Sequence, residues 1–153
     1  MPVIAAQTCD REVVTEYSST TSRAVIQHDL SSDSNVYASL SEGFKAGGYA
    51  TYECTEPYDP EEVTSLEFGF KGNLSDNTSL NASLFRYDYT DFQVLQVVGI
   101  QTVTRNAGDA TVNGLEVEAM SNINDSLSVN YGLTFLDATV TFSCFGCKPA
   151  TTL

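Results

Sequence analysis

The residues best suited to chemistry in this sequence are two cysteines separated by two positions, Cys144 and Cys147. Such a C-x-x-C pair can act as a redox site or bind a metal. A thioredoxin-like site needs a βαβ context, which the sequence does not offer, and zinc needs two more ligands. The one histidine, His28, lies far away in sequence. We therefore expect a small loop disulfide between Cys144 and Cys147, while Cys9 and Cys54 could pair with each other or with partners outside the chain.

Other catalytic arrangements find little support. Acidic residues cluster at 59–62 and at 88–91, but neither cluster has the Asp-x-Asp-x-Asp-Gly pattern of a calcium loop. A single histidine makes a Ser-His-Asp triad hard to build, and no phosphate-binding loop is visible. We expect that the chain binds no cofactor and is not an enzyme. An enzyme that uses the C-x-x-C pair would show a reductase activity that is lost in Cys147→Ser.

Composition limits the partners that the chain could bind. Its 153 residues include 20 Asp and Glu against 7 Lys and Arg, for a formal net charge of −13. Nucleic acid is excluded, because binding to phosphates needs clustered basic residues. The hydrophobic content of 42% and the charged content of 18% are typical of a folded chain rather than a disordered one. No apolar run approaches the roughly 20 residues of a membrane helix, although membrane strands would escape such a count.

The first residues carry no signal for export, since they lack a basic region and a sufficiently long apolar run. The four cysteines nevertheless lie in polar, loop-like contexts that suit an oxidising compartment. These two observations agree if the chain is an internal piece of a longer exported protein.

Apolar and polar residues alternate along the chain with a period of two. For example, Leu66, Phe68 and Phe70 alternate with the polar residues Glu67 and Lys71. Short polar turns alternate with longer connections. The pattern predicts an all-β, antiparallel up-and-down meander of about six long strands. The expected strands cover residues 22–30, 35–44, 62–73, 78–97, 101–121 and 126–142. The alternation changes phase near 84–85, 113–114 and 135–136, which predicts β-bulges or local twists there. Alternatively, the projecting ends of the strands are exposed to water on both faces, so the alternation of apolar and polar residues need not continue there.

The apolar stripe of these strands could face lipid or a soluble core. Small, polar and charged residues on the alternate face favour a wet lumen, and aromatic residues near the long connections favour a membrane-interface girdle. Alternating short and long turns point the same way. The competing interpretation is a soluble β-sheet module for binding or adhesion, in which the apolar stripes pack inward. A soluble monomer in the absence of detergent would favour that module.

Four segments carry a resemblance to a known family. Residues 35–49 (NVYASLSEGFKAGGY) are similar to the "vYas-s-GfKaGGf" signature of TonB-dependent outer-membrane receptors. Residues 58–71, 84–93 and 106–118 resemble the three motifs that follow it in that family. The residues that match family motifs are Tyr37, Gly43, Phe44, Lys45, Gly47, Gly48, Pro60, Glu61, Glu67, Asn106, Ala107, Gly108, Gly114 and Glu116.

The resemblance implies strands from the carboxy-terminal part of a 22-stranded barrel in the cell outer membrane. It covers residues 22–142, with 1–21 unassigned and 143–153 a loop or truncated tail. Such receptors import siderophores, cobalamin or oligosaccharides with energy from TonB. The implied partners are outer-membrane lipid, the rest of the barrel, the plug, TonB through that plug, and a small nutrient ligand. Because plug, TonB box and closing strand are not visible, we expect a fragment that does not transport alone.

The ligand of such a receptor would meet the long connections. The connection at 45–61 is the richest in suitable side chains. The residues expected to contact a ligand are Tyr49, Tyr52, Glu53 and Tyr58.

Overall fold

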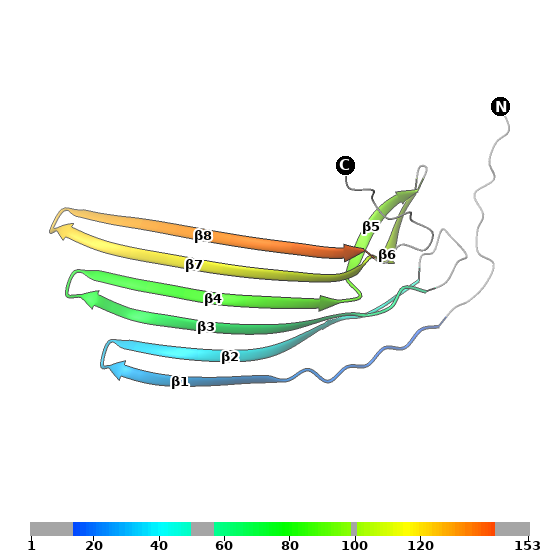
Figure 1. Cartoon of the computed structure of the whole chain (residues 1–153), viewed down its shortest axis with the longest axis horizontal. Helices are drawn as coiled ribbons and strands as arrows, with labels where there is room; N and C mark the ends of the chain where they lie inside the picture. The colour runs from blue at the N-terminus through cyan, green and yellow to red at the C-terminus, as the bar shows by residue number, and fades with distance from the viewer. Residues whose placement is uncertain (1–13, 50–56, 99–100, 143–153) are drawn as a thin grey trace, which may run out of the picture.

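The computed structural model describes residues 14–49, 57–98 and 101–142. Eight strands occupy most of these ranges: β1 (Arg23–Ser31), β2 (Ser34–Lys45), β3 (Glu61–Ser75), β4 (Thr78–Thr90), β5 (Gln93–Val98), β6 (Gln101–Asn106), β7 (Gly108–Asn124) and β8 (Leu127–Phe142). Six form one antiparallel sheet in the order β1-β2-β3-β4-β7-β8, and β5 pairs with β6 in a separate hairpin (Figure 1). The predicted all-β meander is confirmed. Within the described ranges, no helix is long and apolar enough to cross a membrane.

Short polar turns close the three hairpins at one end of the sheet. They lie between β1 and β2, β3 and β4, and β7 and β8 (Figure 1). In each of them a side-chain oxygen accepts a hydrogen bond from the backbone two residues on: Ser31 Oγ from Asp33 N at 3.2 Å, Ser75 Oγ from Asn77 N at 3.4 Å, and Asn124 Oδ1 from Ser126 N at 2.9 Å. These local bonds explain why Ser and Asn mark the turns in the sequence.

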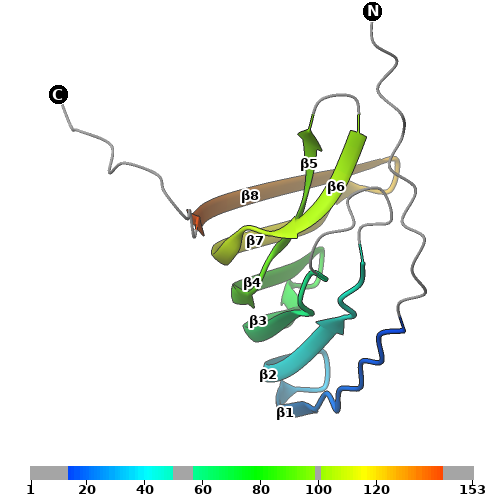
Figure 2. The same ribbon diagram turned by 90° about the vertical axis from the view of Figure 1, so that its right-hand side faces the viewer.

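The two longest predicted strands were wrong in extent. The segment 78–97 divides into β4 and β5, and the segment 101–121 divides into β6 and β7. The backbone bends at Asp91, with φ of 53°, and at Gly108, with φ of 128°, so the β5–β6 hairpin leaves the sheet (Figure 2). A strand needs φ near −120°, so the chain changes direction at these two positions. Asp91 follows the end of β4, and Gly108 begins β7, where it pairs with Phe142. Four strands, β1, β2, β3 and β8, match their predicted ranges within two residues.

The predicted bulges were also wrong. Pairing runs without interruption through Leu84 and Phe85, through Asn113 and Gly114, and through positions 135–136. Among the described strands, the register shifts only beside the short turns. The alternation changes phase because the two faces of the sheet exchange chemical character part-way along the strands, while the backbone register continues unchanged.

One face, which we call the Phe68 face, carries an apolar band next to the short turns. Its side chains come from residues 24–30, 36–40, 66–74, 80–84, 115–123 and 127–135. The longest of these spans cover nine residues, close to the roughly 9–11 that a tilted membrane strand needs. Beyond the band, the same face turns polar on five strands: Glu42, Thr64, Arg86, Asn113 and Asp137.

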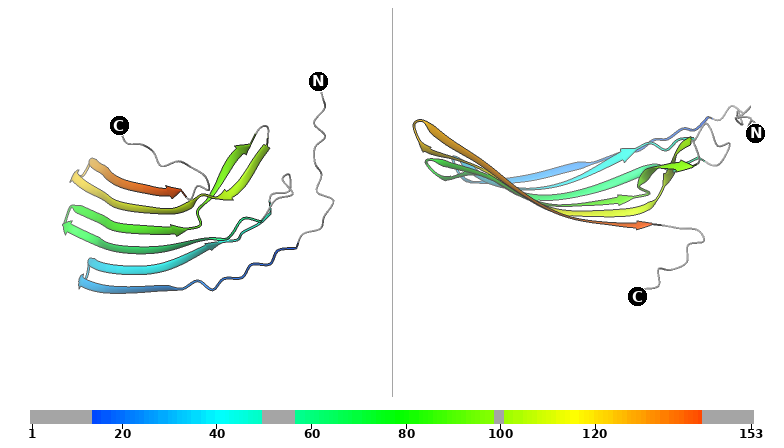
Figure 3. Two further views of the ribbon diagram at one scale, coloured as in Figure 1. Left: turned by 45° about the vertical axis from the view of Figure 1, so that its right-hand side comes forward. Right: turned by 90° about the horizontal axis from the view of Figure 1, so that it is seen from above.

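The apolar band is exposed in this sheet. Phe68 is 51% exposed and Leu133 is 66% exposed, and the sheet forms one curved layer (Figure 3). In the described part of the chain, the buried hydrophobic residues are Phe85, Val103, Ala107, Ala110 and Ala119. A soluble module would bury its apolar stripe against a second layer. The structure therefore does not support the soluble alternative.

The short turns are staggered from one hairpin to the next. Ser34 at the first turn pairs with Gly72, three residues before β3 ends at Ser75. Thr78 at the second turn pairs with Ser121, three residues before β7 ends at Asn124. Figure 1 shows the three turns stepping in one direction. A constant stagger is the register that tilted strands need in a barrel wall.

Candidate functional site

The opposite face of the sheet, which we call the Tyr37 face, is polar at the level of the apolar band. Pairing places Tyr37, Ser83 and Glu116 in one row across β2, β4 and β7, and Lys71 and Glu118 in the next. The hydroxyl of Tyr37 donates a hydrogen bond of 2.5 Å to Glu67 Oε1, and Lys71 Nζ lies 5.2 Å from the centre of the Tyr37 ring. This face suits a water-filled lumen, because its charges lie in a polar network.

Nearer the long connections, the Tyr37 face becomes aromatic. Phe85 and Tyr87 on β4 stack with ring centres 4.9 Å apart, and Tyr89 meets Phe92 edge to face at 5.6 Å. Burial, together with the Glu67 and Glu116 carboxylates, raises the pKa of Tyr87. The aromatic residues expected at a lipid interface therefore divide between the two faces: Phe44 and Phe135 lie on the Phe68 face, whereas Phe85, Tyr87, Tyr89 and Phe142 lie on the Tyr37 face.

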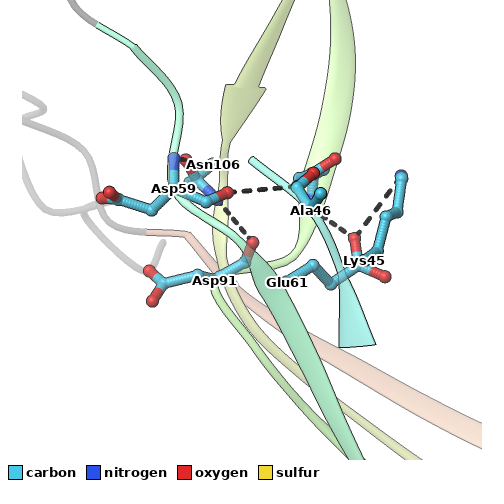
Figure 4. Close-up of polar contacts among 7 residues, drawn as sticks. Lys45, Ala46, Asp59, Glu61, Asp91 and Asn106 are labelled. Carbon is cyan, nitrogen blue, oxygen red and sulfur yellow. Dashed lines mark hydrogen bonds and ion pairs between the residues drawn. The ribbon is translucent and has the colours of Figure 1, made fainter. Parts of the chain in front are cut away.

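The first, second, third and fourth sequence motifs meet at a single place, which we call the loop junction. It consists of Lys45, Ala46, Asp59, Glu61, Asp91 and Asn106, which Figure 4 labels, together with Gln93. Asn106 Nδ2 donates to the carbonyl oxygens of Asp59 at 3.0 Å and of Asp91 at 2.7 Å. Its Oδ1 accepts from Asp59 N at 2.7 Å. One amide side chain therefore joins the β2–β3 connection to both ends of the hairpin region.

Gln93 makes the second set of bonds in the loop junction. Its side chain is enclosed, with 8% of the residue exposed, and Nε2 donates to Ala46 O and Asp59 O, each at 3.1 Å. Its backbone N donates to Glu61 Oε2 at 2.7 Å, and the same carboxylate oxygen lies 3.8 Å from Lys45 Nζ. The motif residues Lys45, Glu61 and Asn106 thus serve one polar network.

The hairpin leaves the sheet through a pair of backbone bonds. Phe92 N donates to Gly108 O at 2.7 Å, and Ala107 N donates to Phe92 O at 2.8 Å. Gly108 needs a positive φ here, which a residue with a side chain rarely adopts. The position of Gly108 in its motif therefore has a backbone reason.

The base of the 45–61 connection is also paired. Gly48 and Tyr58 exchange two backbone hydrogen bonds of 3.1 and 2.9 Å. A Cβ atom at Gly47 would lie 2.5 Å from Tyr58 O, and one at Gly48 would overlap the Tyr58 side chain. The absence of side chains at these glycines allows the two strands of the connection to approach. Tyr58 forms this bridge and Tyr49 follows its partner Gly48, and both tyrosines are partly exposed. Tyr52 and Glu53 fall outside the described residues.

The remaining motif residues serve the sheet itself. Tyr37 bonds Glu67 and covers Gly69, Gly43 lies against Val63, and Gly114 lies under the Phe85 ring. The sequence-based list of site residues missed Gln93, Asp59 and Asp91. A signal was available, because Gln93 and Asp59 belong to segments that match family motifs. All four cysteines lie outside the described residues, and within those residues no three His, Cys, Asp or Glu side chains are grouped as a metal site.

An ion pair marks the polar part of the Phe68 face beyond the apolar band. Arg86 Nε and Nη2 each donate to an Asp88 carboxylate oxygen at 2.7 Å, and Thr111 Oγ1 donates to Asp88 Oδ1 at 2.9 Å. The bonds from Arg86, followed by the bond from Thr111, hold the pKa of Asp88 below its usual range. Asp88 therefore contributes stability above the usual carboxyl pKa.

We predict that replacing this carboxylate gives a pH-dependent loss of stability. Asp88→Asn should unfold more easily than the wild type at neutral pH. The gap should close as the pH falls through the lowered pKa of Asp88, because the wild-type carboxylate then becomes neutral in the folded state too. Unfolding midpoints of both proteins in detergent, measured from neutral to acid pH, check this. A gap that stays constant across that range would contradict it.

Comparison with known sequences agrees with this architecture. The family described as "TonB dependent receptor-like, beta-barrel" matches residues 6–150. The "Probable TonB-dependent siderophore receptor PiuA" of Acinetobacter baumannii is 33% identical over 91 residues, which cover 59% of this chain and 12% of that protein. The matched region is thus about one eighth of the length of this relative.

Solved structures show the same strand arrangement. The siderophore receptor PiuA from Acinetobacter baumannii gives a TM-score of 0.63 at 24% identity, over 84% of this chain and 19% of that one. The ferric yersiniabactin uptake receptor FyuA from Yersinia pestis gives 0.59 at 22% identity, over 76% and 18%. The copper transporter OprC gives 0.60 at 20% identity, over 76% and 20%. At these identities the likeness shows the fold. With the family match over nearly the whole sequence, the chain belongs to the TonB-dependent receptor β-barrel family.

Proposed function

We propose that this chain is one section of the wall of an outer-membrane receptor that takes up a siderophore or a similar nutrient. The names of the relatives support this class of ligand, since two of them are a siderophore receptor and a ferric yersiniabactin uptake receptor. The relatives are receptors and transporters rather than enzymes. TonB would act through a plug domain elsewhere in the receptor.

The observation that carries this proposal is the exchange of character between the two faces. The Phe68 face is apolar over a height suited to lipid and polar beyond it, while the Tyr37 face is polar at the level of that band. A wall between hydrocarbon and a wet lumen needs this arrangement. Within the described residues, β1 and β8 each pair on one side only, so the rest of a barrel would supply their second partners.

The ligand would meet the wall at the end that carries the long connections. Tyr49, Tyr52, Glu53 and Tyr58 remain the proposed contacts, and the aromatic residues Phe85, Tyr87 and Tyr89 line the approach to them. Aromatic rings and polar side chains together can hold a partly apolar, partly charged ligand. The family resemblance supplies the class of ligand.

Neighbouring residues on β4 give a direct test of the wall. In the receptor that carries this segment, Ser83→Cys should react with a membrane-impermeant thiol reagent, because Ser83 is on the Tyr37 face. Leu84→Cys should stay unreactive in the membrane, because Leu84 is on the Phe68 face within the apolar band. Mass spectrometry of the β4 peptide distinguishes these cysteines from the native ones. Equal labelling at both positions would contradict the proposed wall.

Transport itself needs a separate measurement. Uptake of radiolabelled iron should be followed with a panel of catecholate and hydroxamate siderophores, with copper as the comparison metal. We expect uptake of at least one ferric siderophore by cells that express the complete receptor and loss of it when the gene is deleted. Uptake of copper alone would overturn the proposed ligand class and leave the wall proposal unaffected.

A further inference from the structure

The β5–β6 hairpin is held by something other than the main sheet. Its two strands pair with each other, and the backbone bends at Asp91 and Gly108 separate them from β4 and β7 (Figure 2). A two-stranded ribbon is marginally stable alone, and a bend does not fix its direction. The hairpin therefore needs contacts from elsewhere in the chain to keep one position.

Two amide side chains at its base supply such contacts. Gln93 and Asn106 face each other as the first pair of the hairpin. Both side chains donate a hydrogen bond to Asp59 O. Gln93 also donates to Ala46 O, and the Oδ1 atom of Asn106 accepts from Asp59 N (Figure 4). The bonded residues are up to 47 positions apart in sequence.

These bonds join the β2–β3 connection to the β5–β6 hairpin, which lies between β4 and β7. Ala46 and Asp59 lie at the two ends of the β2–β3 connection, and Gln93 and Asn106 lie at the two ends of the β5–β6 hairpin. An enclosed amide that loses its partners leaves carbonyl and N–H groups unsatisfied, and this is costly. Loosening one connection should consequently loosen the other.

We propose that Gln93 and Asn106 are positioning residues that lock the β5–β6 hairpin to the β2–β3 connection, so that the two form one ligand-facing surface. This inference rests on the proposed function, in which the long connections meet the ligand. Neither residue needs to touch the ligand, because each acts through the backbone of the other connection.

Hydrogen exchange of the receptor that carries this segment, in detergent and without ligand, tests the lock. Each variant is read at an amide that the mutated side chain does not bond. Gln93→Ala is read at the amide of Asp59, which Asn106 holds, and Asn106→Ala is read at the amide of residue 93, which Glu61 holds. We expect exchange at least about three- to tenfold faster at both, because this is the factor for losing one intramolecular hydrogen bond and each variant loses more than one. Peptides from β4 and β7 should keep wild-type rates.

Two further variants complete the test. Asn106→Asp keeps an acceptor for Asp59 N but loses the two Nδ2 bonds, so it should behave like Asn106→Ala. Asn122→Ala removes an amide near the short turns, where its Oδ1 accepts from Ser128, and should leave both amides unchanged. Wild-type exchange rates at the two amides in Gln93→Ala and Asn106→Ala would overturn the lock. Because the measurement needs no ligand, failure of siderophore uptake would overturn only the proposed function.

Discussion

Val117→Arg is expected to prevent stable assembly of the barrel wall. Val117 lies on the Phe68 face, in the row of Ala82 and Leu133 within the apolar band. An arginine facing lipid at mid-depth costs about 2–4 kcal/mol, which lowers the folding equilibrium constant roughly 30- to 1,000-fold. The folded fraction of the receptor can be measured from its altered migration on unheated gels, and its stability from unfolding in denaturant.

The matched control for this change is the next residue. Glu118→Arg introduces the same side chain at the same depth, but on the Tyr37 face, beside Asn81 and Gly132. Because this face is wet and already charged, we expect an effect of about 0.5 kcal/mol or less. Equal losses of folded protein for Val117→Arg and Glu118→Arg would show that the Phe68 face does not meet lipid.

Gly114→Val should produce the second large loss of stability. Gly114 pairs with Phe85, and a Cβ atom at this position would overlap the Phe85 ring and lie 2.8 Å from Leu136 Cδ2. Phe85 is only 7% exposed, so its ring has little room to move. Overpacking of this kind costs about 1–3 kcal/mol, which unfolding in denaturant would reveal as a lower midpoint.

Two comparisons separate this clash from a general effect of valine. Gly132→Val, on the next strand and the same face, should be tolerated, because its nearest obstacle to a Cβ atom is Val117 O at 3.8 Å. Phe85→Leu combined with Gly114→Val should be less destabilised than the sum of the single changes, since a smaller side chain relieves the overlap. Additive losses would mean that Phe85 is not what requires glycine at 114.

Local patterns were sufficient to predict much of the sheet. The alternation of Leu66, Phe68 and Phe70 with polar neighbours placed β3 within two residues of its observed ends. Turn residues such as Ser31 and Asn124 located the hairpins, because their side chains accept hydrogen bonds from the nearby backbone. Both signals act over a few residues, so they are readable without knowledge of the fold.

The predictions of bulges and of strand lengths were wrong where the chemical surroundings change along a strand. At Leu84 and Phe85 the change of phase in the sequence looked like an inserted residue, yet the pairing is regular. A bulge and an exchange of environment leave the same local pattern of apolar and polar residues. Only the pairing with β3 and β7 distinguishes them. The bend at Asp91 was not predicted for a similar reason, because a positive φ at a non-glycine residue leaves only a weak signal in the local sequence.

Side-chain alternation is a property of each strand alone, so an antiparallel sheet with one apolar and one polar stripe could be predicted from the amino-acid order. The family motifs were also visible as four separate segments. Their convergence on Asp59 through Gln93 and Asn106, and the exchange of character between the stripes beyond the apolar band, became evident in the folded chain. Both depend on contacts between residues tens of positions apart, whose register no local pattern specifies.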